Sequence, residues 1–451
     1  MKRERVKDPG FYKAYFTLFF TVALQNLIVF SVNLADSVML GRYDETAMSG
    51  VSLANQIQFF LQCAVNGAAS GLVVLGSQYW GKMDIASVKK VFAAAFAVGV
   101  GIALLIALPV LLFPAAALGL LSNEAAIVAE GAAYIRILGF SYVMFAVTFL
   151  LVSLYRSVES AGLGFYASLL ALVVNVALNY ALIFGKLGFP SLGVKGAAWA
   201  TLISRAAEML FVLVYVFLVD RRLGLRPKDA FAVEKPYFVD FLKAGLPLVG
   251  SGSSWGIAMA VQTAIIGRLG AAAIGANAVA APVFQVVAVF YTSASTAASV
   301  LIGKTVGEND VPRVKQRAKR LQWIFVATGL ISSLILLLGR DFIIGLYDLA
   351  PETRALSVVF LTILAFTVIG SAYEAPALVG IVSGGGDTAF VLRNDLIFMW
   401  GIVLPCSALS AFVFHWPVPV TFLLLRADQI LKCFVALVKV NRFRWIRNLT
   451  R

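Results

Sequence analysis

Long apolar runs dominate this sequence of 451 residues, and short breaks that contain charged residues, glycine or proline separate them. Hydrophobic residues make up 61% and charged residues 13% of the chain, whereas soluble globular domains contain roughly 45–50% apolar and about 25% charged residues. A water-soluble globule and a disordered chain are therefore both excluded. A helix needs about 20 apolar residues to cross a bilayer, so the runs predict an all-α polytopic membrane protein with twelve transmembrane helices. The runs lie near residues 15–40, 48–79, 91–121, 125–152, 162–185, 196–219, 241–266, 273–303, 321–347, 354–383, 392–414 and 418–439.

The distribution of positive charge predicts the orientation of these helices. Most of the 37 lysines and arginines fall on one side of the predicted membrane, in the N-terminus, the loops after every second run, the interval 220–240 and the tail from Lys439. Cytoplasmic loops carry such an excess. We therefore expect a multi-pass protein of the cell (inner or plasma) membrane with both termini cytoplasmic. The first run is longer than the apolar region of a cleaved signal peptide, so it is expected to remain as a helix.

The two halves of the sequence resemble each other when the chain is shifted against itself by half its length. At this repeat offset Gly41 aligns with Gly267, and Gly81 aligns with Gly307. Six runs separate the two copies, so both halves cross the membrane in the same sense, as in parallel repeats of transporters that use alternating access. We predict two pseudosymmetric six-helix lobes joined by a linker. The predicted domains are an N-terminal lobe at 1–219, a cytoplasmic linker at 220–240, and a C-terminal lobe at 241–451 with a basic cytoplasmic tail.

Polar side chains of three different runs are predicted to meet at one depth in the first half. Asp36 lies six residues before Arg42, which corresponds to about 9 Å along a helix. Asn179 lies at a similar depth with Asn175 one turn deeper, and Thr201 lies about five residues inside the next run. Ionisable residues inside a membrane indicate functional sites by default. A carboxylate with amide and hydroxyl oxygens suits a hard cation such as Na⁺, or a proton on the carboxylate itself.

An alternative is that these polar groups only hold helices together, as polar residues in membranes often do. The repeat argues against a purely architectural role, because the residue that aligns with Asp36 is the uncharged Gln262, which is itself a candidate substrate or pathway residue. A second alternative to a cation site is a salt bridge between Asp36 and Arg205, which lies one turn beyond Thr201. Glu208, three residues after Arg205, could pair with it instead.

A polar stripe follows one face of the second run, at spacings of three and four residues. It either lines an aqueous passage or joins helices, and the sequence does not separate these two possibilities. The stripe consists of Asn55, Gln58, Gln62 and Asn66.

The second half offers two carboxylates as candidate substrate or proton contacts. Glu374 lies inside its run beside Pro376 and is the favoured candidate, whereas Asp395 lies near a helix end, where it could be solvated or paired with Arg393. The turn at 384–388, Gly-Gly-Gly-Asp-Thr, lacks the lysine of a phosphate-binding loop. One histidine and three separated cysteines form no metal-ligand motif, so we expect no cofactor and no metal beyond Na⁺ at Asp36.

At these residues the chain resembles the multidrug and toxic compound extrusion (MATE) family of cation-coupled exporters. The similarity runs nearly end to end. It includes the segment from Asp36 to Arg42, Asn175 to Gly185, Gly193 to Thr201, the turn at 384–388, Asp395 to Trp400, and a basic tail with Trp445.

The resemblance implies two lobes around a V-shaped cavity and ion-driven export of amphipathic, often cationic compounds. It also implies a cation site built from Asp36, Asn175, Asn179 and Thr201. Three features depart from the family. Many relatives have a second aspartate at Asn179, some have a kink proline in the first span, and some have an acidic pair in the seventh span, where 241–266 contains no carboxylate.

Together these features predict an antiporter driven by Na⁺ or H⁺, with no enzymatic activity, that contacts membrane lipids and a small-molecule substrate and acts as a monomer. Because loop topology accounts for the basic charge, we expect no nucleic-acid partner. The alternative is a flippase for a lipid or a lipid-linked intermediate, for which Arg136 and Arg205 are the candidate residues. His415 alone provides no constellation for an enzyme. The substrate and the choice between sodium and proton remain open.

Overall fold

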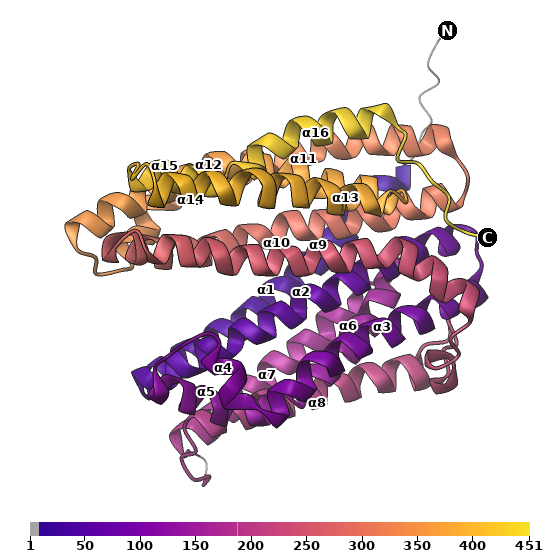
Figure 1. Ribbon diagram of the computed structural model, residues 1–451. Coiled ribbons are helices and arrows are strands. Elements are labelled where there is room, and N and C mark those ends of the chain that lie inside the picture. Colours follow the sequence, from indigo (N-terminus) through magenta and orange to yellow (C-terminus); the bar gives the residue numbers. More distant parts are fainter. Residues whose placement is uncertain (1–8, 187) are drawn as a thin grey trace. The chain divides into compact units, whose positions relative to one another are not determined.

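The computed structural model describes residues 9–186 and 188–451, and the regular structure in these ranges is helical (Figure 1). Three of the elements, η1, η3 and η4, are π-helical, and η2 is a short 3₁₀ helix. In chain order the elements are α1 (Pro9–Gly41), α2 (Glu45–Gly81), α3 (Ile85–Leu112), α4 (Pro114–Gly119), α5 (Ala125–Leu138), α6 (Ser141–Ser157), α7 (Gly162–Phe184), α8 (Val194–Val214), η1 (Tyr215–Val219), η2 (Pro227–Ala230), α9 (Lys235–Gly267), α10 (Ala271–Gly307), α11 (Val311–Gly345), α12 (Pro351–Ala375), η3 (Pro376–Val382), α13 (Thr388–Asp395), η4 (Leu396–Val403), α14 (Leu404–Phe412), α15 (Val418–Leu425) and α16 (Asp428–Arg442).

Each of the twelve predicted runs corresponds to one helix or to consecutive helices in this order. Within the described residues, nine helices are long and apolar enough to cross a membrane, and α5 with α6, bent by 52° at their junction, makes a tenth. The other two runs correspond to α9, whose first turns carry charged residues, and to α15 with α16, which are interrupted at Arg426–Ala427 and are each short.

The helices form two compact units. The N-terminal lobe comprises Thr21–Gly76 and Met83–Val249, and the C-terminal lobe comprises the first part of α1 up to Phe20, Ser77–Lys82 and Gly250–Arg451. Contacts therefore assign the first residues of α1 and the end of α2 to the C-terminal lobe, and the first half of α9 to the N-terminal lobe. In the N-terminal lobe this half of α9 packs closely on α2, where Gly71 lies against the backbone of Gly245.

The sequence repeat has a structural counterpart at the turns that follow α2 and α10. Asp84 caps α3 by accepting a hydrogen bond from the Ser87 amide at 3.0 Å, and Asp310 caps α11 in the same way. The repeat offset aligns these two aspartates. Asx side chains at this position satisfy amides that the first helical turn leaves without partners. The residues before them, Met83 and Asn309, both have positive φ, at 61° and 58°. The repeat thus preserves backbone conformation as well as sequence.

The ends of α2 and α10 cross within the C-terminal lobe at residues that the repeat relates. A Cβ atom on Gly81 would overlap the Lys304 carbonyl oxygen, and one on Gly307 would overlap the Gln78 carbonyl oxygen. The repeat offset that aligns the two glycines also aligns Gln78 with Lys304. The two contacts are therefore images of each other, and both need glycine because backbone meets backbone there.

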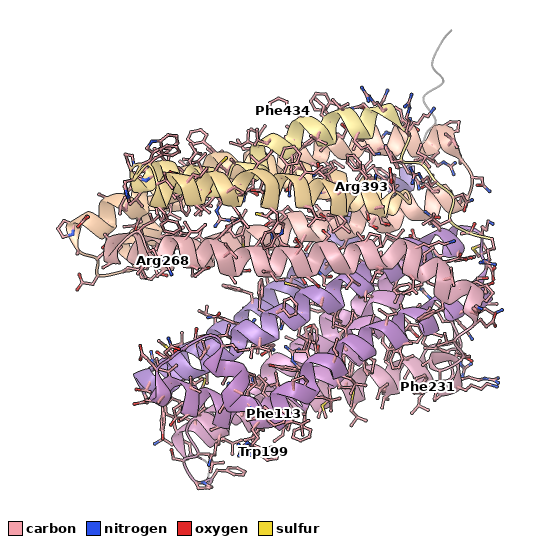
Figure 2. All side chains as sticks on the ribbon, viewed as in Figure 1. Phe113, Trp199, Phe231, Arg268, Arg393 and Phe434 are labelled. Carbon is pink, nitrogen blue, oxygen red and sulfur yellow. The ribbon has the colours of Figure 1, made fainter. Side chains whose placement is uncertain are left out.

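Each lobe buries an apolar core and exposes a second apolar surface. The N-terminal core gathers residues such as Leu61 and Ile135, and the C-terminal core gathers residues such as Phe360 and Phe422. Large apolar side chains outside the cores remain exposed, among them Phe113 and Phe434 (Figure 2). Exposed apolar surface of this extent on apolar helices is typical of lipid-facing residues.

The C-terminal tail is packed rather than loose. The Trp445 side chain is buried against Gly385 of the glycine-rich turn, and the Leu449 amide donates a hydrogen bond to Gln78 Oε1 at 2.8 Å. Asp387 of the same turn forms ion pairs with Lys439 at 2.7 Å and with Arg447 at 3.2 Å. The run at 384–388 thus forms the predicted tight turn, and the tail holds it to the end of α2.

Candidate cation and substrate sites

Three helix ends of the N-terminal lobe position the predicted cation ligands. Asp36 lies in the last turns of α1. Helix α7 ends at Gly185, whose left-handed conformation (φ 66°) stops the helix, and Asn179 lies less than two turns before that stop. Helix α8 begins after Gly193, also at positive φ, so that Thr201 falls about two turns into it. Glycine accepts this conformation without the steric cost that a side chain brings.

The four predicted ligands form one hydrogen-bonded group. Asn179 Nδ2 donates to Asp36 Oδ1 and, at 3.0 Å, to Asn175 Oδ1. Asn175 Nδ2 donates to Thr201 Oγ1 at 3.4 Å, and the Thr201 hydroxyl donates to the Ala197 carbonyl at 3.0 Å. The four side chains are buried, and both asparagines are fully inaccessible. The depth argument from the sequence therefore groups residues that are in contact.

One oxygen of this group has no hydrogen-bond donor. Asn179 Oδ1 is buried and has no partner within the described residues. Leaving a buried acceptor unsatisfied costs about 1–3 kcal/mol. The atom belongs to the same amide that contacts the Asp36 carboxylate, and carboxylate, amide and hydroxyl oxygens are the ligands that hard cations prefer. The group is thus chemically suited to one small cation, or to a proton on Asp36.

Arg205 forms an ion pair with Glu208 rather than with Asp36. The distance from Arg205 Nη1 to Glu208 Oε2 is 2.7 Å, and both side chains are buried. The Arg205 guanidinium also lies over the Phe145 ring, 5.7 Å from its centroid. The local pairing that the sequence suggests as an alternative is therefore present, and it leaves the Asp36 carboxylate to the amides of α7.

A small cavity adjoins this ion pair on the side of Thr201. It lies between α1, α7 and α8, has a volume of about 10 Å³, and is lined in part by Thr201, Ser204, Arg205 and Glu208. That volume is about the minimum that holds one water molecule. The Ser168 hydroxyl, which also lines the cavity, is buried without a hydrogen-bond partner in the described part of the chain. A hydroxyl without a partner makes this cavity suitable for water.

The polar stripe of α2 lies at the surface of the N-terminal lobe. Asn55, Gln58 and Gln62 are half-buried and Asn66 is exposed. Within residues 9–186 and 188–451, the structure gives none of the four a side-chain hydrogen bond. Both readings of the stripe, an aqueous passage and a contact between helices, therefore stay predictions.

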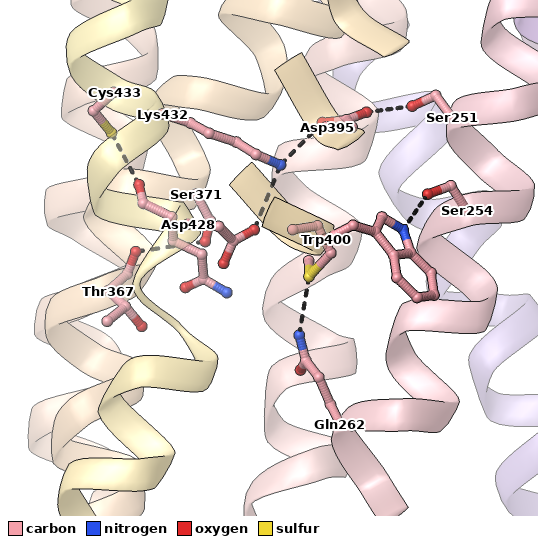
Figure 3. Close-up of polar contacts among 12 residues, drawn as sticks. Ser251, Ser254, Gln262, Thr367, Ser371, Asp395, Trp400, Asp428, Lys432 and Cys433 are labelled. Carbon is pink, nitrogen blue, oxygen red and sulfur yellow. Dashed lines mark hydrogen bonds and ion pairs between the residues drawn. The ribbon is translucent and has the colours of Figure 1, made fainter. Parts of the chain in front are cut away.

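Asp395 has a different partner from the one considered from the sequence. Arg393 Nε donates to the Ala389 carbonyl at 3.2 Å, whereas Asp395 Oδ1 accepts from Lys432 Nζ at 2.9 Å (Figure 3). Pairing with Arg393 is therefore wrong, because Arg393 bonds to its own helix while Lys432 reaches Asp395 from α16. Ser251 of α9 donates to the other carboxylate oxygen.

Gln262 and Glu374 also lie in the C-terminal lobe. Gln262, which the repeat aligns with Asp36, is buried and donates through Nε2 to Met399 Sδ at 3.5 Å. Glu374 is half-buried at the end of α12, within electrostatic range of Lys432, Asp428 and Asp395. The structure thus places Glu374 and Asp395 in one cluster and Gln262 beside it, whereas their predicted role in binding substrate stays a prediction.

Comparison with known proteins identifies the family. The sequence model of the MatE family matches residues 22–181 and 253–409, which together cover more than half of the chain. The chain belongs to the MATE family. The resemblance seen in the sequence is thereby confirmed.

Curated relatives match this MATE protein over most of their own length. The uncharacterized transporter YisQ of Bacillus subtilis is 24% identical over 399 residues, which cover 87% of this chain and 86% of YisQ. The probable multidrug resistance protein NorM of Streptococcus pneumoniae (strain R6) is 23% identical over 395 residues, covering 88% of this chain and 87% of NorM. These relatives are thus described as a transporter and a multidrug resistance protein.

Solved structures share the fold. A variant of the Vibrio cholerae MATE transporter VcmN superposes with a TM-score of 0.87 at 18% identity, covering 98% of both chains. A transporter of the MOP superfamily from Pyrococcus furiosus superposes with a TM-score of 0.85 at 17% identity, covering 97% of both chains. The predicted all-α fold of twelve transmembrane helices in two lobes is therefore confirmed.

Lys432 and Asp428 of the C-terminal cluster are not among the residues predicted from the sequence. Both lie in the last apolar run. The signal is present in the sequence, because a lysine inside a membrane helix is as costly as a carboxylate and points to a partner.

Proposed function

We propose that this MATE protein exports amphipathic, mostly cationic small molecules in exchange for Na⁺ or H⁺, and that Asp36 takes up the coupling cation. The observation that carries the proposal is the buried group around Asp36, in which an amide oxygen lacks a donor among the described residues and Arg205 is paired elsewhere. Asn175, Asn179 and Thr201 would complete the cation site. Family membership and the name of the NorM relatives support drug export.

The burial of Asp36 explains how cation binding could be coupled to a change of conformation. An ionised carboxylate without a cation partner in a dry site costs several kcal/mol. Binding of Na⁺ or H⁺ removes this cost and so favours the conformation in which the site is closed. A state that stays open to water tolerates the ionised form. In this mechanism the cation and the substrate stabilise different conformations, so that the exit of one accompanies the entry of the other.

The alternative of a lipid flippase rests on buried arginines that would hold an anionic head group. Arg205 is neutralised by Glu208, and Arg136 is exposed at the surface of α5. Neither of these two candidate arginines is therefore a buried cation left to bind a lipid phosphate. We further propose that the protein is a monomer in the cell membrane with both termini in the cytoplasm, as its loop charges suggest.

Transport by purified protein in liposomes, with sodium and pH gradients imposed separately, tests the proposal. We expect one of the two gradients to drive accumulation of an organic cation such as ethidium. The Asp36→Asn variant should remain folded and lose gradient-driven transport, whereas Asp348→Asn, which changes an exposed carboxylate, should transport like the wild type. Wild-type rates in Asp36→Asn would refute the assignment of Asp36.

A further inference from the structure

Three interruptions of regular α-helix meet in the C-terminal lobe. Helix α12 turns into the π-helix η3 at Pro376, two residues after Glu374, and α13 turns into the π-helix η4 directly after Asp395. The third interruption separates α15 from α16 just before Asp428. Helix α16 packs against both η3 and η4. Interrupted helices of this kind surround binding sites in transporters, and π-helical turns are frequent at functional sites.

Lys432 lies at the centre of these interruptions. Its ammonium group is 2.9 Å from Asp395 and 3.5 Å from Asp428, and only 6% of its side chain is exposed (Figure 3). Glu374 is within electrostatic range of Lys432, and Arg426 is within electrostatic range of Asp428. The cluster therefore contains three carboxyl groups and two cationic groups.

One side of this cluster is open. The Asp395 side chain is 23% exposed and Trp400 is 38% exposed. The π-helical turn places both residues against α9, where Ser251 donates to Asp395 and the Trp400 indole donates to Ser254 at 2.7 Å. An accessible carboxylate next to an accessible indole combines the two groups that recognise an organic cation, by ion pairing and by cation–π attraction.

We propose that Asp395 and Trp400 form a binding site for the ammonium group of an organic cation, and that Lys432 occupies this site as a tethered competitor until the ligand displaces it. The inference rests on the proposed export of cationic compounds and names one place where they would bind. Two carboxylates, Asp395 and Asp428, hold the single ammonium group of Lys432. The proposed competition gives this arrangement a function.

Displacement leaves Lys432 with a partner. Asp428 precedes it by four residues on α16, the spacing at which helical side chains meet, and the two are already 3.5 Å apart. The ammonium group can therefore move from Asp395 to Asp428 without being left unpaired in the lobe. Ligand binding then replaces the Asp395–Lys432 ion pair by an ion pair between Asp395 and the ligand. The free energy of the Asp395–Lys432 pair is lost on binding, and this loss lowers the apparent affinity for the ligand.

Binding of ethidium to the purified full-length protein, followed by fluorescence, tests the inference. We expect Lys432→Met to tighten binding by about tenfold, the factor that corresponds to a competing ion pair of about 1.4 kcal/mol. Asp395→Asn should weaken binding at least tenfold while keeping the Lys432–Asp428 pair. The matched control is Lys439→Met on the same helix, which removes the ion pair with Asp387 and should leave ethidium affinity unchanged.

Methylammonium, which has the head group of lysine, provides a second readout. It should compete with ethidium in Lys432→Ala, where the vacated position accepts it, and compete far less in the wild type. Unchanged affinity in Lys432→Met, equal tightening in Lys439→Met, or unchanged affinity in Asp395→Asn would overturn the inference. If these binding results hold but no gradient drives transport in liposomes, the proposed function fails while the binding site stands.

Discussion

The ion pair between Arg205 and Glu208 can be used to test whether it prevents Arg205 from pairing with Asp36. At 2.7 Å and an effective dielectric constant of about 20, its Coulomb attraction is about 6 kcal/mol. Removing one partner of a buried pair typically costs about 3–5 kcal/mol. We therefore expect Glu208→Gln to lower the free energy of unfolding by about 3–5 kcal/mol. The loss is smaller if the released guanidinium of Arg205 forms a new ion pair with Asp36.

The same variant should lose cation-driven transport, because a guanidinium that pairs with Asp36 excludes the coupling cation. The double variant Arg205→Met, Glu208→Gln removes this competitor and should recover both transport and, to within about 1 kcal/mol, stability, as replaced buried pairs often do. Denaturant titration in detergent and transport in liposomes measure the two effects. Wild-type behaviour of Glu208→Gln would refute the pairing, and a double variant as inactive as the single one would show that the guanidinium is not the cause.

Two further predictions concern single positions. Asn179→Leu removes the amide that contacts Asp36, so half-maximal transport should require about tenfold more coupling cation, measured by varying Na⁺ or pH; an unchanged requirement would contradict a ligand role. Gly307→Ala places a methyl group against the Gln78 carbonyl oxygen, so it should lower the free energy of unfolding by about 1–3 kcal/mol or more. Gly101 on α3 has open space around it. Gly101→Ala should therefore leave the stability unchanged or raise it by up to about 1 kcal/mol. Equal stability of the two alanine variants would contradict the close crossing.

The number and order of the apolar spans could be predicted because they depend on local composition, whereas helix α11 begins ten residues before its predicted run. Every run found in the sequence corresponds to a helix or helix series, since a membrane requires about 20 apolar residues whatever their neighbours are. The assignment of helix ends to lobes could not be predicted, because it depends on contacts between distant segments. The first residues of α1 and the first half of α9 are examples, and both join the lobe formed mainly by the other half of the chain.

The N-terminal site could be predicted because helix geometry converts residue spacing into depth. Asp36, Asn179 and Thr201 are each close to a helix end that glycine or a charged residue marks, so their depths could be compared from the constant rise per helical residue. What the sequence could not provide is the rotation of each helix. Only the structure shows that these side chains face one another and that Arg205 turns to Glu208.

The C-terminal cluster shows where such reasoning fails. The sequence suggests Arg393 as the partner of Asp395 because the two are neighbours along the chain, although the actual partner, Lys432, comes from another helix. The π-helices that frame the cluster have only a weak sequence signal, namely Pro376 and Pro405, whose missing amides prevent a regular hydrogen-bond ladder. Neither proline indicates by itself which side chains the altered turn brings together.

The reciprocal crossing of α2 and α10 bears on the origin of this chain. A contact in which Gly81 meets Lys304 while Gly307 meets Gln78 has the form of an interface between identical subunits, where the same patch serves on both sides. A half-length ancestor would have been able to pair with a second copy of itself through these glycines. A fusion of two such genes would only have had to join polypeptides that already assembled, and the two halves could then differ, as they do where one has Asp36 and the other Gln262.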